Sequence, residues 1–401
     1  MSKFYEVAII GGGSAGLMCA VELLRGDDAL SGQDVLILER NDRVGKKLIS
    51  TGNGQGNLCN ANFGIQFYYG DKAFVKAFVD QANEIDIQKY LLDLGIPLVT
   101  TAGGKMYPIS KQASAVLDIL RAFLSSRDCQ IETGVLVEQI KRTSGGFMVM
   151  TNGDTYFAKN VIFATGGKSQ KQMGTDGTSY AIAEKLGHKV TKLYPSLVQL
   201  KTELTDIKGL RGLKETAKVT AYDGNKELKS ATGEILFTEY GVSGNAVFMI
   251  SSALADVKDP IIKVEFLPDY TATQIEQMLS SRQKEGYFNG ELYLCGLVNK
   301  KIGQAVQKRA KSNSASDVTY ALKNFTIKVT GNLGFNYSQV TRGGLFTDQV
   351  DPYTMQSKIQ KSFYLIGEVL DIDGDCGGYN LTFAFISAIV SARAIKHNKS
   401  K

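Results

Sequence analysis

The sequence predicts an α/β protein whose first domain contains a parallel sheet and is interrupted by a β-rich insert. Three observations carry this prediction. An apolar run at 5–10 leads through glycines into helix-spaced apolar residues at 15–24 and a second apolar run at 35–38, which is the order of a βαβ unit. Residues 135–164 read as a meander followed by a buried strand. Residues 195–264 are rich in strand-forming segments that alternate between polar and apolar side chains.

The segment after the βαβ unit predicts antiparallel strands joined by tight turns. Gly145-Gly146 marks one turn, and Asn152-Gly153 is a strong hairpin signal between two alternating segments. We expect a strand to return through 155–158. We expect a separate buried strand to follow at 161–164.

The rest of the chain predicts an insert followed by a return to the first domain. Residues 271–324 have a helical pattern and are rich in Gln, Lys and Ser, whereas a strand at 363–366 and a closing helix at about 381–395 fit the first domain again. The predicted parts are residues 1–194 for the N-terminal part of the first domain, 195–333 for the insert and 334–401 for the C-terminal part.

Composition excludes several classes of protein. Hydrophobic residues make up 43% and charged residues 21% of the chain, as in ordinary globular proteins, so disorder and coiled coils are excluded. The net charge of +6 is spread along the sequence, and no apolar run approaches the roughly 18 residues of a membrane span. We therefore expect a cytoplasmic protein with a small-molecule substrate and with neither a nucleic acid nor a membrane as partner; the composition leaves the oligomeric state open.

The inventory of reactive side chains excludes further chemistry. The chain has two histidines, and none of its five cysteines is in CxxC spacing. A histidine-based hydrolase, a metal site and a dithiol redox motif are therefore disfavoured. Cys59 and Cys376 lie in motifs described below, and we expect them to be packing residues; we expect His188 to be a helix-end residue.

The residues after the first strand form a dinucleotide-binding motif. Gly11, Gly13 and Gly16 fit the G-x-G-x-x-G pattern, in which glycines permit a tight turn, approach of a pyrophosphate and close helix packing. Glu39 ends the second strand near the position of the carboxylate that binds a ribose hydroxyl. A 2′-phosphate would be repelled by Glu39, so this pocket disfavours NADP.

The order of elements after this motif indicates FAD rather than NAD. The meander leads into a strand ending Ala164-Thr165-Gly166-Gly167, and this order resembles the FAD domain of glutathione-reductase-like flavoproteins. No second G-x-G-x-x-G motif follows, so we expect one tightly bound dinucleotide. NAD(P)H would then be a transient co-substrate.

Several further stretches show a closer resemblance that spans residues 10–388. They are 46–54, 57–60, 106–108, 237–244, 354–358, 367–371 and 377–381. Together they resemble the family of NAD(P)/FAD-dependent oxidoreductases that includes aminoacetone-oxidase-type flavoproteins and bile-acid-pathway reductases.

The resemblance implies a set of FAD contacts. It implies that the loop 52–54 lies against the isoalloxazine, that Asn57 fixes this loop, and that Glu368 and Asp371 face the ribityl and pyrophosphate groups. The last helix would direct its N–H groups at the flavin pyrimidine ring. The candidate FAD-binding residues are Gly11, Gly13, Ser14, Ala15, Gly16, Glu39, Arg40, Lys47, Gly52, Asn53, Gly54, Asn57, Val135, Ala164, Thr165, Gly166, Gly167, Gly367, Glu368, Asp371, Gly378, Tyr379, Asn380 and Leu381.

The function predicted from these residues is FAD-dependent redox chemistry. We expect a hydride to pass between a small organic substrate and the flavin N5, with NAD(P)H or dioxygen as the other redox partner. The insert is expected to cap the flavin and form the substrate pocket. Two alternatives stay open, a non-catalytic FAD-binding redox sensor and an FAD-dependent tRNA-modifying enzyme; no catalytic acid or base is identified.

Overall fold

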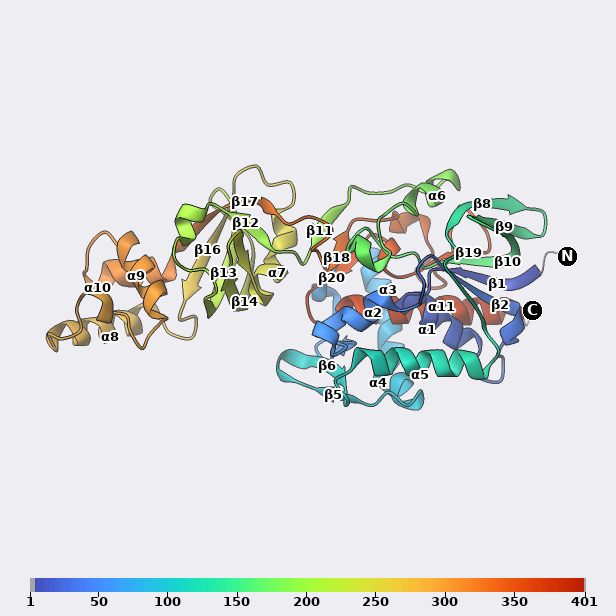
Figure 1. Cartoon of the computed structure of the whole chain (residues 1–401), viewed down its shortest axis with the longest axis horizontal. Helices are drawn as coiled ribbons and strands as arrows, with labels where there is room; N and C mark the ends of the chain where they lie inside the picture. Colours follow the sequence, from blue (N-terminus) through green and yellow to red (C-terminus); the bar gives the residue numbers. More distant parts are fainter. Residues whose placement is uncertain (1–3, 400–401) are drawn as a thin grey trace. The chain divides into compact units, whose positions relative to one another are not determined.

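The structure, a computed structural model, describes residues 4–399 and divides the chain into two compact units (Figure 1). Unit 1 contains the chain up to Leu193 and again from Val340 onward, and unit 2 is Tyr194–Gln339. Residues 334–339, which the sequence analysis assigned to the first domain, lie in unit 2. Their backbone stays bonded to that unit, since Gln339 N donates to Leu197 O at 3.2 Å.

The sheet of unit 1 is parallel at its centre and antiparallel at one side. Its strand order is β7 (Gln130–Thr133), β2 (Val35–Glu39), β1 (Phe4–Ile10), β10 (Thr155–Phe163), β9 (Gly146–Thr151) and β8 (Val137–Thr143), with β19 (Phe363–Leu365) also paired to β10. β1 pairs in parallel with both β2 and β10, as βαβ topology requires. The apolar strands β1 and β2 are buried apart from Phe4 and Glu6 of β1, and their C-terminal ends lead into the site described below.

One strand replaces the two that we expected at 155–158 and 161–164. β10 runs without a break, with its first half antiparallel to β9 and its second half parallel to β1. Asn160 does not interrupt it, because its buried side chain donates to Glu6 O at 3.1 Å. A polar residue inside the strand is tolerated here because its amide finds a backbone partner.

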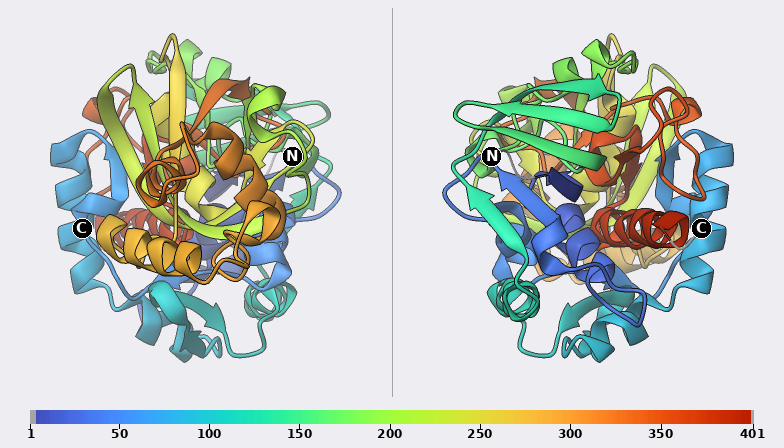
Figure 2. Two further views of the ribbon diagram at one scale, coloured as in Figure 1. Left: turned by 90° about the vertical axis from the view of Figure 1, so that its left-hand side faces the viewer. Right: turned by 90° about the vertical axis from the view of Figure 1, so that its right-hand side faces the viewer.

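Helices cover the sheet of unit 1. α1 (Ser14–Leu23) packs against α11 (Tyr379–Lys399), which begins two residues before the helix that the sequence predicted. α11 is apolar around most of its circumference and is a core helix; Figure 2 shows it in red beside the blue N-terminal elements in the right-hand view. The others are α2 (Lys46–Ser50), α3 (Lys72–Glu84), α4 (Ile87–Asp93), α5 (Ala113–Ser126) and α6 (Tyr180–Lys185).

Short strands of unit 1 lie near the ends of these helices. β3 (Cys59–Asn60), β6 (Lys105–Pro108) and β5 (Leu98–Thr100) form one small sheet, and β20 (Ile372–Gly374) pairs with β4 (Tyr68–Gly70). They bring the segment after α2 to the start of α11.

Unit 2 is a closed barrel with an attached group of helices. The barrel strands are β12 (Leu200–Thr202), β15 (Gly241–Ser243), β14 (Lys226–Phe237), β13 (Lys214–Asp223), β16 (Pro260–Phe266) and β17 (Phe325–Asn332). Between β16 and β17 the chain forms α8 (Ala272–Lys284), α9 (Lys300–Arg309) and α10 (Ala315–Lys323); α7 (Asn245–Ser251) also packs on β14. Closure pairs every strand on both sides and so leaves no exposed edge. Within residues 4–399 no helix is long and apolar enough to cross a membrane.

Candidate functional site

The glycine motif sits in the turn between β1 and α1, and two of its glycines are needed by the fold itself. Gly11 has φ +107°, and a Cβ there would lie 2.5 Å from Ala164 O at the end of β10. A Cβ on Gly16 would collide with Gly11 O. These two positions allow strand, turn and helix to pack closely.

Gly13 is different, because its missing side chain opens a free space. Its backbone is extended, at φ −81° and ψ −169°, and a Cβ there would have nothing within 4 Å. Gly13 is the N-cap of α1, which has no side-chain cap and no acidic residue in its first turn among the described residues. The helix therefore presents Ser14, Ala15 and Gly16 N–H groups and the positive end of its dipole beside this space, as phosphate-binding helices do.

Glu39 ends β2 beside this turn, and its carboxylate is held by backbone groups. Gly12 N donates to Glu39 Oε2 at 2.8 Å, and Asn41 donates to Oε1 from its N at 2.8 Å and from Nδ2 at 2.7 Å. A carboxylate has about four acceptor sites, so room for a hydroxyl donor remains.

Arg40 and Val135 lie next to Glu39, and both already have protein partners. Arg40 forms an ion pair with Asp176 at 2.8 Å, and Val135 N donates to Glu39 O at 3.0 Å. Burial alone would raise the pKa of Asp176, but hydrogen bonds from Arg40 and Thr178 lower it to about 2. This pair connects the end of β2 to the loop that precedes α6.

The residues after β10 lie beside the turn from β1 to α1. Ala164 N donates to Ile10 O at 2.9 Å, and Gly166 has φ +71°. Thr165 Oγ1 is buried without a hydrogen-bond partner among the described residues. A Cβ on Gly167 would lie 2.5 Å from Thr341 Oγ1 and 2.9 Å from Glu368 Oε1. The glycine therefore lets the Gly367–Asp371 segment approach this loop.

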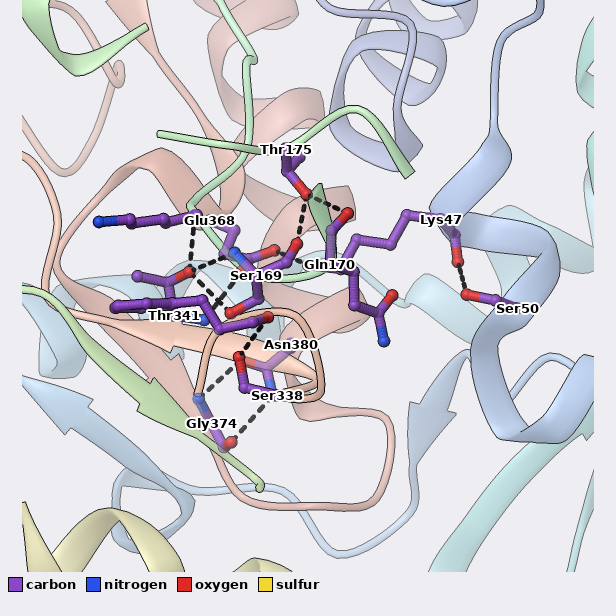
Figure 3. A network of polar contacts seen from close by, with 12 residues as sticks. Lys47, Ser50, Ser169, Gln170, Thr175, Ser338, Thr341, Glu368, Gly374 and Asn380 are labelled. Carbon is purple, nitrogen blue, oxygen red and sulfur yellow. Dashed lines mark hydrogen bonds and ion pairs between the residues drawn. The ribbon is translucent and has the colours of Figure 1, made fainter. Parts of the chain in front are cut away.

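The Gly367–Asp371 segment lies against the start of α1 as well. A Cβ on Gly367, which has φ +70°, would lie 3.0 Å from Ala15 Cβ. Glu368 Oε2 accepts from Lys47 Nζ at 2.7 Å, and Thr341 N donates to Glu368 Oε1 at 2.9 Å (Figure 3). Burial raises the pKa of Asp371, although a hydrogen bond from Thr191 opposes this shift.

The loop after α2 meets the start of α11. Gly52 and Asn53 both have left-handed backbone, at φ 57° and 55°, and Gly54 has φ +84°. In the amide orientation that satisfies both neighbours, Asn57 donates to Cys59 O at 3.1 Å and accepts from Gly378 N at 3.2 Å. Two segments more than 300 residues apart are thus held together.

The first side chains of α11 are structural, so only their backbone groups are available to a ligand. The Tyr379 ring stacks on Phe67 with centroids 4.6 Å apart. Asn380 binds both backbone groups of Gly374, at 2.8 Å each. No acceptor among residues 4–399 takes the N–H groups of Tyr379, Asn380 and Leu381.

The two cysteines in this region are a buried thiol, Cys59, and a half-buried thiol, Cys376. Burial raises the pKa of Cys59 to about 12 and also raises that of Cys376. Both are free, and a thiol that stays protonated is a poor nucleophile. Within residues 4–399 no group of three metal-ligating side chains could hold an ion.

The comparisons with known proteins agree with this geometry. Residues 5–394 match the model of the HI0933-like protein Rossmann domain. The chain is 34% identical, over 97% of its length and 98% of the other protein, to the 3-dehydro-bile acid delta(4,6)-reductase of Clostridium scindens. The chain belongs to the HI0933-like family.

Other relatives of this HI0933-like chain are more distant. It is 28% identical to the ribosomal RNA dihydrouridine synthase of Haemophilus influenzae, over 98% of this chain and 99% of that protein. Its fold is similar to that of the 3-ketosteroid delta1-dehydrogenase from Sterolibacterium denitrificans, with a TM-score of 0.55, 12% identity and coverage of 98% and 100% of the two chains.

The HI0933-like chain is an FAD-dependent oxidoreductase, and the residues of unit 1 fit the cofactor. The space at Gly13, the uncapped start of α1 and the buried, unpartnered Thr165 hydroxyl suit a dinucleotide. Tyr180 OH is also buried without a partner among the described residues, and its pKa is raised by burial and by Glu368 and Asp371.

Sequence reasoning missed Thr341 and Tyr180. Residues 341–344 read Thr-Arg-Gly-Gly, where the glycines indicate a turn, but nothing in this segment marks the Thr341 side chain as a partner of the loop after β10. Nothing in the sequence around Tyr180 distinguishes it from a packing aromatic.

Neither histidine is expected to be essential in the HI0933-like chain. His188 is buried, with Nε2 3.1 Å from Ser357 Oγ, and exposed His397 lies within α11 rather than in a tail after it. We expect a His188→Gln, His397→Gln double variant to keep turnover within about tenfold, since loss of a general acid or base costs about 10²–10⁴. A loss above a hundredfold with full flavin content would contradict this.

His188 should also make the stability of the folded protein depend on pH. Burial lowers its pKa, so the folded protein binds a proton less readily than the unfolded chain, whose histidine pKa is about 6.5. This contribution to stability is present above about pH 6.5 and is lost as pH falls toward the folded pKa. Urea unfolding at pH 5.5 and 7.5 should therefore show a smaller difference for His188→Gln than for the wild type.

Proposed function

We propose that the chain binds one FAD in unit 1 and reduces a carbon–carbon double bond conjugated with a carbonyl group in a small apolar molecule, with NAD(P)H as the source of electrons. The observation that carries this proposal is the 34% identity, over nearly the whole chain, to a protein named as a reductase of 3-dehydro-bile acids. The dihydrouridine synthases share the chemistry, because the reactive double bond of uridine is also conjugated with a carbonyl.

Different residues of unit 1 would bind different parts of FAD. Gly13 leaves space for the pyrophosphate at the start of α1, and Glu39 has acceptor capacity for a ribose hydroxyl. Glu368 and Asp371 would take the ribityl hydroxyls. When bound, FAD supplies the N5 position that accepts or donates a hydride.

The loop Gly52–Gly54 and the start of α11 would hold the flavin ring. Gly52 and Gly54 carry no side chains, and a Cβ on Gly54 would meet only Ile49 O at 4.0 Å, so the backbone at Gly54 can lie against a planar ring. The N–H groups at the start of α11 would point toward the flavin pyrimidine ring and favour negative charge there.

The test is an absorption spectrum of the purified protein followed by anaerobic titration with NADH and NADPH. We expect one FAD per chain, bleaching by one of the two nucleotides, and reoxidation by an α,β-unsaturated ketone with ping-pong kinetics. The chain carries a single G-x-G-x-x-G motif. A ternary complex of FAD, NAD(P)H and substrate in equilibrium dialysis would contradict the single-site prediction, and reoxidation by dioxygen alone would favour an oxidase or a redox sensor.

An RNA substrate is a second candidate, because relatives of this length are named for ribosomal RNA. In unit 2, the exposed Lys284, Lys301, Lys308 and Lys311 of the helical portion have no ion-pair partner within the described chain. An RNA-binding enzyme would retain RNA with an affinity that falls steeply with salt. Equal reduction of a free enone with and without RNA would favour the small-molecule substrate.

A further inference from the structure

Thr341 is the second residue of unit 1 after the chain returns from unit 2, and its side chain is buried. It lies in β18 (Val340–Arg342), and none of the roles given above belongs to it. Figure 3 shows it at the centre of a network of polar contacts.

The hydroxyl of Thr341 holds the loop that follows β10. Thr341 Oγ1 accepts from Lys168 N at 2.7 Å and from Ser169 N at 3.0 Å, and it lies 3.0 Å from Ser169 Oγ. A hydroxyl has two acceptor sites and one donor, so these three contacts use its full capacity. Valine has the same shape and offers none of them.

The backbone of Thr341 holds the carboxylate assigned to FAD. Thr341 N donates to Glu368 Oε1 at 2.9 Å, and Glu368 Oε2 pairs with Lys47 Nζ at 2.7 Å. The Gly167 α-carbon packs between the Thr341 hydroxyl and Glu368, where a Cβ would touch both. Thr341 thus joins three segments that are candidates for FAD contact.

The segment that leads from unit 1 into unit 2, around Thr191, is hydrogen-bonded to the residues after Thr341. Thr191 N donates to Gly344 O at 2.8 Å, and Gly344 N donates to Thr191 Oγ1 at 2.9 Å. Leu345 N donates to Val369 O at 2.8 Å, and Asp371 N donates to Leu345 O at 3.0 Å. Glu368 and Asp371, the two carboxylates expected to face FAD, therefore lie in a segment whose backbone is bonded to Leu345, four residues after Thr341.

We infer that Thr341 is a positioning residue for FAD, which fixes Glu368 and the loop Gly166–Ser169 in the geometry that the cofactor needs. The inference rests on the proposed function, because it assumes that FAD occupies unit 1. Linkage makes the effect reciprocal: if the seated Thr341 favours FAD binding, bound FAD must stabilise the returning strand by the same factor.

The test compares Thr341→Val with Thr341→Ser in the full chain. We expect the valine variant to bind FAD about 10- to 100-fold more weakly, because two N–H groups lose their acceptor. The serine variant, which keeps the hydroxyl, should stay within about threefold of the wild type. The matched control is Thr319→Val in α10, where a buried threonine hydroxyl has no partner among residues 4–399 and FAD affinity should not change.

A second measurement separates positioning from a general loss of structure. Hydrogen exchange of the wild type should show that FAD protects the amides of residues 168–169 and 340–346, and that this protection is lost in Thr341→Val. Wild-type FAD affinity in the valine variant, or equal weakening in the serine variant, would overturn the inference. If the wild type binds no FAD, the proposed function itself fails.

Circular dichroism of the apoproteins shows whether Thr341→Val folds. A different variant is needed if it does not. In that case Ser169→Ala, which removes the hydroxyl that lies 3.0 Å from Thr341 Oγ1, replaces it. The inference then requires a weaker FAD complex in Ser169→Ala, and unchanged FAD affinity in this variant would overturn it.

Discussion

A Gly13→Val variant is expected to fold and to purify without FAD. A Cβ at Gly13 would meet no protein atom within 4 Å, and the extended backbone there is open to any residue. The valine would instead fill the space at the start of α1 that the pyrophosphate needs. The flavin absorbance of the purified variant, measured against protein concentration, should be near zero while its circular dichroism matches that of wild-type apoprotein.

Two control variants make this result specific. Gly153→Val adds the same side chain in the β9–β10 turn, where nothing lies within 4 Å either, and it should keep its full flavin content. Gly16→Val should instead fail to fold, because its Cβ would collide with Gly11 O. Normal flavin content in Gly13→Val would contradict the assignment of the FAD pyrophosphate to this turn.

The part of the candidate site that the sequence predicts is the turn from β1 to α1, which contains Gly13 and Gly16. The turn from β1 to α1 and the carboxylate of Glu39 are fixed by contacts within about 30 residues, such as that of Gly12 N with Glu39 at 2.8 Å. Local spacing encodes these positions, so the motif was sufficient to predict the βαβ unit.

Long-range contacts carry the rest of the site, and spacing cannot reveal them. Asn57 bonds to Gly378, and Thr341 bonds to Ser169 172 residues away. The motif around Tyr379 predicted N–H groups directed at the cofactor, and it gave no indication that the Tyr379 ring stacks on Phe67. The spacing of a motif does not reveal which of its side chains pack in the core and which backbone groups stay available.

Unit 2 shows the same limit at the level of topology. Alternating segments predicted strands, but barrel closure depends on β12 pairing with β17, where Leu200 faces Asn332. Strand propensity is local, whereas a barrel is decided by pairing between distant strands.

The second large effect is expected at Glu22, a carboxylate buried where α1, α4 and α11 meet. Its Oε2 accepts from Tyr90 OH at 2.8 Å, and its Oε1 accepts from Arg393 Nε at 3.0 Å. Lys396 Nζ, also buried, lies 3.7 Å from Oε1 and 2.8 Å from an Asp28 carboxylate oxygen. Glu22 thus neutralises cations of α11 inside the packed interface with α1.

Glu22→Ala is therefore expected to destabilise the protein by about 1–3 kcal/mol, because the buried Tyr90 hydroxyl loses its acceptor. Lys396 loses one of its two carboxylates and keeps Asp28 at 2.8 Å. The chain has no tryptophan, so urea unfolding is followed by circular dichroism. Asp80→Ala, which breaks the exposed ion pair of Asp80 with Lys76 at 2.6 Å, is the control and should leave the urea midpoint almost unchanged. Equal midpoints for the two variants would mean that the Glu22 cluster does not stabilise the contact between α1 and α11. Because Gly13 caps the start of α1, a loss of stability at the far end of this helix should also weaken FAD binding. Flavin content in urea below the unfolding midpoint would report that coupling.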